Sequence, residues 1–247
     1  MLSFINNDNF ELKLLSKNHG ADITRNNILM GYIEESIFSN FIIRMVKESL
    51  PLFKFGNGNP KIGLVSGVHG NELPPQIASI ILIEKLFETP KIEGTIYMVP
   101  FASPIATMNN VRRLNHRDMN RSAHRSGSTT NIILNNFLKE GLDAVADFHS
   151  TALLSNPGCE SVFCSKNPNL KSMEIANFIT KFTGSKLISY DNAGATYAGA
   201  LEDELNINGI PAVTCEVLSE NSTVSQGSIE RALFQMNTFL KLFDIVI

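Results

Sequence analysis

The chain of 247 residues has no tryptophan and only three cysteines. An odd and small number of cysteines argues against a disulfide framework. Cys159 and Cys164 also lack the matching second pair that a closed zinc site would need. No uncharged apolar run reaches the length of a membrane-spanning helix. Residues 1–10 are polar and lack the apolar core of a signal peptide. These absences predict a cytoplasmic protein without a membrane partner.

A strong excess of charge is also missing. The sequence has 21 basic Lys and Arg residues against 24 acidic Asp and Glu residues, which gives a net charge of −3. Such a balance predicts no nucleic-acid partner, because nucleic-acid binding usually needs a basic surface. A hydrophobic content of 43% is enough for a sizeable core, and the length suits one α/β domain. The oligomeric state stays open.

The most informative stretch of the sequence runs from Gly63 to Glu72. Its first part is a short apolar run bounded by glycines, which predicts a buried strand. His69 and Glu72 then follow in the loop after that strand. In open α/β sheets, ligands bind outside the carboxyl ends of the strands. Imidazole nitrogen and carboxylate oxygen both suit zinc, and a catalytic zinc site typically has three protein ligands and one open position. The chain should therefore supply a third ligand and a general base elsewhere.

Two further apolar runs carry suitable groups. The run over residues 143–150 ends in His149 and Ser150, and the run over residues 212–217 contains Glu216. A carboxylate inside such a run is costly unless it is paired or hydrogen-bonded. The structural alternatives are a core histidine at a strand end and an edge-strand glutamate that faces water. The pattern favours His149 as the third ligand and Glu216 as the general base.

The most basic part of the chain lies between residues 112 and 125. A run of this kind usually marks a solvated face or a phosphate patch. A guanidinium can also hold a carboxylate through two hydrogen bonds, which would make this segment the wall of a pocket for a small carboxylate substrate. The arginines are Arg112, Arg113, Arg117, Arg121 and Arg125.

Taken in order, these motifs resemble a known family. His-x-x-Glu after a strand, then Asp-x-Asn-Arg, then a strand ending in His-Ser, then Thr-x-Glu, is similar to the succinylglutamate desuccinylase/aspartoacylase family. Its members are zinc amidohydrolases related to the metallocarboxypeptidases. The resemblance runs from about Lys61 to about Val217. It implies one zinc ion per chain, held by His69, Glu72 and His149.

The resemblance also implies roles for other residues. Glu216 matches the catalytic glutamate of the family's Thr-x-Glu motif. Asn120 and Arg121 match the pair that binds the carboxylate end of the substrate. Asp118 matches the acidic residue that hydrogen-bonds a zinc-bound histidine and so fixes its orientation.

In this family, an arginine upstream of the Asn-Arg pair polarises the scissile carbonyl. Arg113 is the best match in this sequence, and Arg112 and Arg117 are close competitors. The sequence leaves the choice among the three open.

The rest of the pattern alternates strands and helices. It predicts a three-layer α/β/α fold around a central mixed, mostly parallel sheet, like that of the zinc carboxypeptidases. Strands are predicted over residues 10–15, 41–46, 61–66, 94–100, 143–149, 161–164, 186–190 and 212–217. Helices are predicted over residues 74–87, 129–138, 170–182 and 225–245. Residues 191–201 are predicted to form a loop over the pocket, in which Tyr197 or the preceding Tyr190 contacts substrate or simply packs.

The predicted function is hydrolysis, by metal-activated water, of the amide bond of an N-acyl amino acid or a similar small carboxylate. A metallocarboxypeptidase that acts on peptide C-termini is the main alternative, and an ester substrate is another. A non-catalytic binding protein is the third, but the joint presence of all the expected site residues weighs against it. The sequence is predicted to form a single catalytic domain over residues 1–247. Little sequence follows Glu216, so the family's C-terminal β domain is expected to be absent and the pocket more open.

Overall fold

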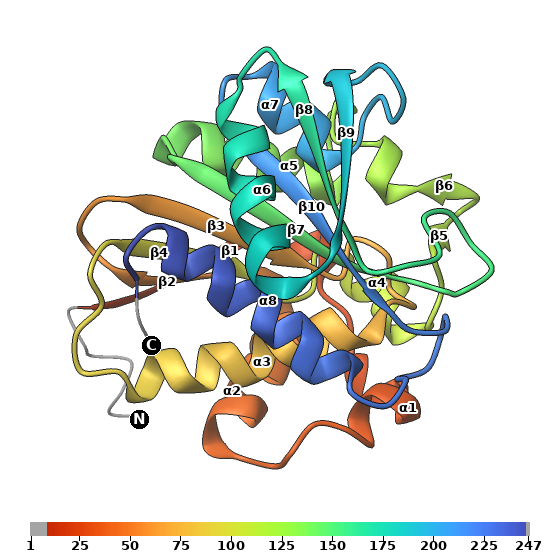
Figure 1. The fold of residues 1–247 in the computed structure, drawn as a ribbon. Helices are drawn as coiled ribbons and strands as arrows, with labels where there is room; N and C mark the ends of the chain where they lie inside the picture. Colours follow the sequence, from red (N-terminus) through yellow and green to blue (C-terminus); the bar gives the residue numbers. More distant parts are fainter. Residues whose placement is uncertain (1–8, 246–247) are drawn as a thin grey trace.

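The computed structural model describes residues 9–245, so most of the polar segment 1–10 lies outside the described residues. An eight-stranded sheet crosses the molecule in the order β1-β2-β4-β3-β7-β10-β8-β9 (Figure 1). The strands are β1 (Phe10–Ser16), β2 (Leu50–Gly56), β3 (Lys61–Ser66), β4 (Thr95–Val99), β7 (Ala144–Thr151), β8 (Ser161–Asn167), β9 (Lys186–Asn192) and β10 (Ala212–Leu218). A separate small hairpin consists of β5 (Arg113–Leu114) and β6 (Arg117–Asp118).

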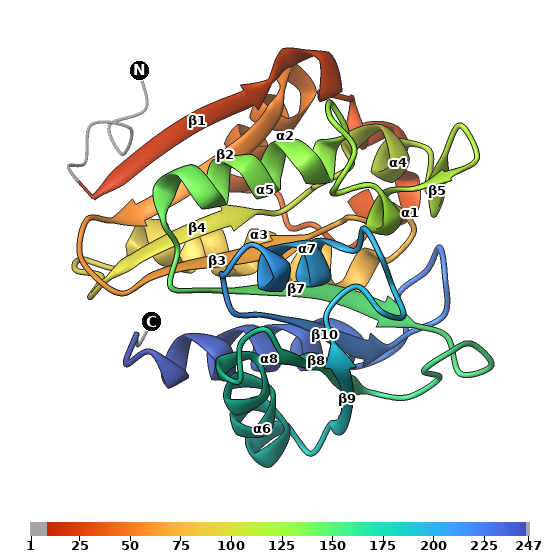
Figure 2. The same ribbon diagram turned by 90° about the horizontal axis from the view of Figure 1, so that it is seen from above.

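Helices cover both faces of the sheet (Figures 1 and 2). The longer helices are α2 (Ile37–Glu48), α3 (Leu73–Glu88), α5 (Thr129–Glu140), α6 (Lys171–Thr183) and α8 (Ser228–Leu242). The shorter ones are α1 (Asn27–Met30), α4 (Pro104–Met108), α7 (Leu201–Ile207) and the 3-10 turns η2 (Lys17–His19), η3 (Ile23–Arg25) and η4 (Met119–Arg121). Helices α2, α3, α6 and α8 share one buried apolar cluster, whereas α5 and α7 belong to a second cluster. The three-layer α/β/α prediction is therefore confirmed.

The middle of the sheet is parallel, as predicted. Strand β3 pairs in parallel with β4 and β7, and β7 pairs in parallel with β10. All eight residues of β7 are buried. Strands buried on both faces read as continuous apolar runs, which explains why the sequence located these strands well. Antiparallel pairs occur where β2 joins β1 and β4, and where β10 joins β8.

The segment before β3 differs from the predictions. Residues 41–46 lie inside α2 rather than in a strand, and the strand β2 follows immediately and was not predicted. The buried residues Phe41, Ile42, Met45 and Val46 recur at helical spacing. Ser36 and Ser39 cap the start of α2 through reciprocal hydrogen bonds. The apolar run is therefore the buried stripe of a helix.

The predicted loop 191–201 is largely present, since most of its residues form turns. Strand β9 extends to Asn192, and α7 begins at Leu201. This helix was missed in the sequence, and it lies next to β7 and β10 over the sheet (Figure 2). Between residues 9 and 245, no helix is both long and apolar enough to cross a bilayer.

Candidate metal and catalytic site

His69 and Glu72 lie in the loop between β3 and α3, as the sequence predicted. Gly67 turns the chain after β3 with a φ of 72°, a conformation that favours glycine. Gly70 packs its backbone against α4, where an added Cβ would lie 2.0 Å from the carbonyl carbon of Ala106. Only glycine fits such an approach, so this contact fixes the loop. The side chains of His69 and Glu72 are consequently buried, each about 2% exposed.

His149 comes from the neighbouring strand. Strands β3 and β7 are parallel, with Ser66 opposite Phe148, so their carboxyl ends lie side by side. His149 is therefore brought next to the loop that carries His69 and Glu72. One ligand atom from each of these three residues lies within 4.8 Å of the others. Among the described residues, this is the one group of side chains with the spacing of a metal site.

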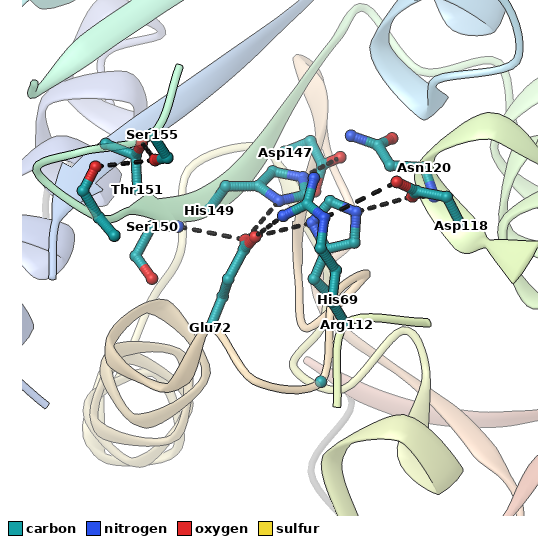
Figure 3. A network of polar contacts seen from close by, with 12 residues as sticks. His69, Glu72, Arg112, Asp118, Asn120, Asp147, His149, Ser150, Thr151 and Ser155 are labelled. Carbon is teal, nitrogen blue, oxygen red and sulfur yellow. Dashed lines mark hydrogen bonds and ion pairs between the residues drawn. The ribbon is translucent and has the colours of Figure 1, made fainter. Parts of the chain in front are cut away.

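Each histidine is held between two carboxylates (Figure 3). On one side, the Nδ1 atom of His69 lies 2.8 Å from Glu72 Oε1, and that of His149 lies 2.7 Å from Glu72 Oε2. On the other side, the Nε2 atom of His69 lies 2.8 Å from Asp118, and that of His149 lies 2.8 Å from Asp147. The backbone N–H of the next residue, Ser150, also donates to Glu72 Oε2 at 3.2 Å. Both imidazoles are thus fixed in place with Nδ1 toward Glu72.

Asp147 is a site residue that the sequence analysis did not identify. It is fully buried and lies two positions before His149, on the same face of β7. The Asp-x-His spacing in a strand was the available signal, because side chains at i and i+2 share a face. Asp147 plays for His149 the part that Asp118 plays for His69.

The histidines and carboxylates of the cluster stabilise one another's charged forms. Burial lowers the pKa of His149, but the negative charges of Asp147 and Glu72 outweigh burial and hold it well above its usual value. The pKa of His69 is raised in the same way by Glu72 and Asp118. Although burial alone would raise it, the pKa of Glu72 is held well below its usual value by the two histidines.

The donor set fits a divalent cation. Each imidazole nitrogen faces a carboxylate oxygen. His69, Glu72 and His149 would hold a divalent cation, whose charge the surrounding carboxylates would balance. Two imidazoles and one carboxylate also match the ligand set of catalytic zinc sites.

Glu216 lies beside this cluster. Strand β10 is flanked by β7 and β8, and Glu216 is in register with His149 on β7, so the edge-strand alternative does not apply. Its Oε2 atom is buried without a hydrogen-bond partner among residues 9–245. Burial, and then the negative charge of Glu72, raise the pKa of Glu216 to about 8. A carboxyl group poised near neutral pH has the proton affinity of a general acid or base.

Among the three competing arginines, the structure brings Arg112 to the cluster. Its Nη1 atom donates to Glu72 Oε1 at 2.7 Å, and its Nε atom lies 3.7 Å from Asp118 Oδ2. Arg113 and Arg117 are exposed on the small hairpin and do not line the cavities at the site. Geometry therefore favours Arg112 over the sequence's best match, Arg113.

Asn120 and Arg121 lie on η4 and face the same cavity as His69 and Glu216. Asn120 is 8% exposed, and its Oδ1 atom accepts a hydrogen bond from the backbone N–H of Leu201 at 3.0 Å. The Arg121 guanidinium lies over the ring of Tyr197, 4.6 Å from the ring centre. Tyr197, from the loop after β9, thus packs on the arginine and also lines the cavity. That Tyr197 or Tyr190 contacts substrate stays a prediction.

Two cavities meet at Arg112 and Glu216 in the described part of the chain. The first contains His69, Asn120 and Arg121 in its lining. The second is lined by the end of β7 and by the loop that follows it, including Ser150, Thr151 and Asn156. Thr151 and Ser155, which are hydrogen-bonded at 2.8 Å, border this second cavity (Figure 3). Open space therefore borders Glu216 in both cavities, where a small substrate could contact it.

Comparison with known families agrees with this geometry. Residues 59–243 match the model of the succinylglutamate desuccinylase/aspartoacylase catalytic domain. The chain therefore belongs to that family, as its sequence motifs indicated. Named activities of the family and its structural relatives (desuccinylase, aspartoacylase and carboxypeptidase) are hydrolytic. No curated protein matches the sequence.

Solved structures share the fold at low sequence identity. An aspartoacylase family protein from Mesorhizobium loti is 20% identical, with a TM-score of 0.66, over 98% of this chain and 69% of that one. A succinylglutamate desuccinylase/aspartoacylase from Rhodobacter sphaeroides is 18% identical, with a TM-score of 0.61, over 80% of this chain and 60% of that one. A metallo-carboxypeptidase from Burkholderia cenocepacia is 13% identical, with a TM-score of 0.61, over 98% of this chain and 66% of that one. This chain thus corresponds to roughly two thirds of the length of such relatives.

Proposed function

We propose that this protein is a zinc-dependent hydrolase that cleaves the amide bond of an N-acyl amino acid or a similar small carboxylate. The observation that carries the proposal is the buried cluster of His69, Glu72 and His149, with Glu216 in register beside it. The three residues of the cluster would hold one zinc ion per chain. When bound there, zinc would supply Lewis acidity to polarise a carbonyl and to acidify water.

Other residues of the chain would bind the substrate, transfer the proton and stabilise the developing charge. Asn120 and Arg121 would hold the substrate carboxylate in the first cavity. Glu216 would take a proton from the attacking water at its carboxylate and later give that proton to the leaving amine nitrogen. Arg112 would stabilise the negative charge that develops on the carbonyl oxygen, since its guanidinium reaches the cluster. Asp118 and Asp147 would keep the two histidines in orientation.

A metallocarboxypeptidase is the second candidate, because the fold is shared with a metallo-carboxypeptidase over 98% of this chain. The two functions differ in substrate. A deacylase would prefer N-acyl amino acids, whereas a carboxypeptidase would prefer N-blocked dipeptides and longer peptides. A panel of N-acyl amino acids and blocked dipeptides, assayed with the zinc-loaded protein, separates them through kcat/KM.

Glu216→Gln tests the mechanism common to both candidates. The amide keeps the shape of the side chain but cannot accept the proton, so we expect kcat to fall by roughly 10²–10⁴-fold. Zinc content should be unchanged, because Glu216 is not one of the proposed ligands. The control is Glu220→Gln, which removes the same charge at an exposed position just beyond β10. Wild-type turnover in the Glu216→Gln variant would overturn the assignment.

A further inference from the structure

One buried acidic residue in the first cavity has no part in the mechanism above. Glu202, the second residue of α7, is only 5% exposed, yet it lines the cavity that also contains Asn120 and Arg121. The adjacent Asp203 is 4% exposed. A buried carboxyl group is costly unless a partner compensates its charge. Glu202 therefore calls for an explanation.

The partners of Glu202 within the described residues are neutral. Its Oε1 atom accepts hydrogen bonds from Asn206 Nδ2 at 2.7 Å and from Ser165 Oγ at 3.4 Å. No lysine, arginine or histidine between residues 9 and 245 forms an ion pair with it. Burial, and then the negative charge of Asp203, raise the pKa of Glu202 well above its usual value. The Glu202 carboxyl group thus lines the cavity without a basic partner of its own among residues 9–245.

We propose that Glu202 determines substrate specificity by binding a cationic side chain, an ammonium or a guanidinium, on the amino-acid part of the substrate. The inference rests on the proposed function and narrows its substrate class to N-acyl derivatives of basic amino acids. Asn120 and Arg121 would hold the α-carboxylate in the same cavity. A cation beside Glu202 would favour the ionised carboxylate and would donate a charge-assisted hydrogen bond to it.

A purely structural role for Glu202 is the competing explanation. Its partner Asn206 also hydrogen-bonds both the backbone N–H and the carbonyl of Ala212, at 3.0 and 2.9 Å, and so connects α7 to β10. Glu202 could simply position that asparagine. The test must therefore distinguish a change in preference between substrates from a general loss of folding or activity.

The experiment compares zinc-loaded wild type, Glu202→Gln and Glu204→Gln on Nα-acetyl-L-lysine, Nα-acetyl-L-arginine and N-acetyl-L-norleucine. Norleucine has nearly the length of lysine but no charge. For wild type we expect kcat/KM to be at least about tenfold higher for the lysine or arginine derivative than for the norleucine one. In Glu202→Gln the ratio of these two kcat/KM values should fall toward one. Glu204→Gln should keep the wild-type ratio, since Glu204 lies on the same helix but does not line the cavity.

Binding of the free amino acids gives a readout that does not depend on turnover. Calorimetry should show that wild type binds L-lysine or L-arginine more tightly than L-norleucine, and that Glu202→Gln loses this difference. Absence of hydrolysis of every acylated compound would count against the proposed function, whereas the binding data would still decide the role of Glu202. Equal wild-type affinity for the charged and neutral amino acids would overturn the inference. So would a Glu202→Gln variant that unfolds earlier on heating and loses all substrates in equal proportion.

Discussion

At the scale of single residues, two aspartates orient the two histidines that we propose as metal ligands. His69 and His149 each have one nitrogen held by an aspartate, which leaves the other nitrogen facing Glu72. Residues that hold a ligand in this way commonly matter almost as much as the ligand itself. Metal binding should therefore depend on Asp118 and Asp147 as well as on the three proposed ligands.

Asp147→Asn tests this dependence. The amide presents a weaker acceptor to His149 Nε2, so we expect zinc affinity to fall by about 10–100-fold. Competition with a chromophoric chelator measures the change directly. Asp143→Asn is the matched control, because Asp143 is exposed and precedes the same strand. Zinc binding as tight as in wild type would show that Asp147 does not support the site.

The second prediction at this scale concerns the arginine that faces the substrate carbonyl. Arg112→Ala should lower kcat by about 10²–10³-fold, the usual cost of losing a group that stabilises an oxyanion. Arg113→Ala should stay close to wild type, because Arg113 is exposed outside the cavities. Steady-state kinetics of both variants on the best N-acyl substrate shows which arginine acts on the carbonyl. The reverse result would favour the assignment based on sequence alone.

At the scale of elements, the unit formed by β3, its following loop and α3 positions two of the three ligands. Gly70 sets this unit by its close approach to α4. Gly70→Ala should destabilise the protein by about 1–3 kcal/mol, as overpacking of a tight contact usually does. Urea unfolding in the presence of a chelator measures this cost. Gly58→Ala is the control, since the nearest atom to its added Cβ lies 3.5 Å away. An equal loss of stability in both variants would contradict the role of the close contact at Gly70.

The helices and strands differ in how well the sequence predicts them. Strands β3, β7 and β10 were predicted because they are buried apolar runs that end at, or contain, a polar residue with a clear chemical use. Residues 41–46 were misassigned because a short apolar run fits either a strand or the buried stripe of a helix. Helix α7 is only seven residues long, too short for a periodic pattern. Glu202 was missed together with this helix.

The sequence also could not predict the direction in which several side chains of the site point. Arg112 and Arg113 are adjacent, and only the geometry of the hairpin shows that Arg112 reaches Glu72. Asp147 was readable in principle from its spacing to His149. The partners of Glu202 come from β8 and α7, so no local pattern indicates them.

At the scale of the whole molecule, an ion pair far from the site connects one edge of the sheet to α5. Lys13 Nζ on β1 lies 2.6 Å from Glu140 Oε1, and Tyr97 Oη on β4 donates to Glu140 Oε2 at 3.0 Å. The hydrogen bond from Lys13 lowers the pKa of Glu140, and the bond from Tyr97 adds to this against the opposing effect of burial. A lowered pKa in the folded state means that ionised Glu140 stabilises the fold.

This contribution should be present at neutral pH and be lost as the pH falls through the folded-state pKa of Glu140. Glu140→Gln is therefore expected to cost up to about 1 kcal/mol at pH 6, and the difference from wild type should shrink as the solution is made more acidic. Urea unfolding at pH 6 and at successively lower pH measures it. Glu48→Gln, at an exposed position on α2, should show no such trend. A difference that grows toward acid would contradict the assignment.

Residues of the α/β/α fold line both cavities at the site. The loop after β7 contributes Asn156 to each of them. The prediction of a single catalytic domain over residues 1–247 stays a prediction.

The metal content of the protein decides whether the cluster of His69, Glu72 and His149 binds an ion. Elemental analysis should compare wild-type protein with the His69→Ala/His149→Ala double variant, after both are supplied with zinc and freed of excess. We expect about one zinc ion per chain in wild type and none in the folded double variant. Wild-type protein without metal, or a double variant that retains it in full, would contradict the proposed metal site.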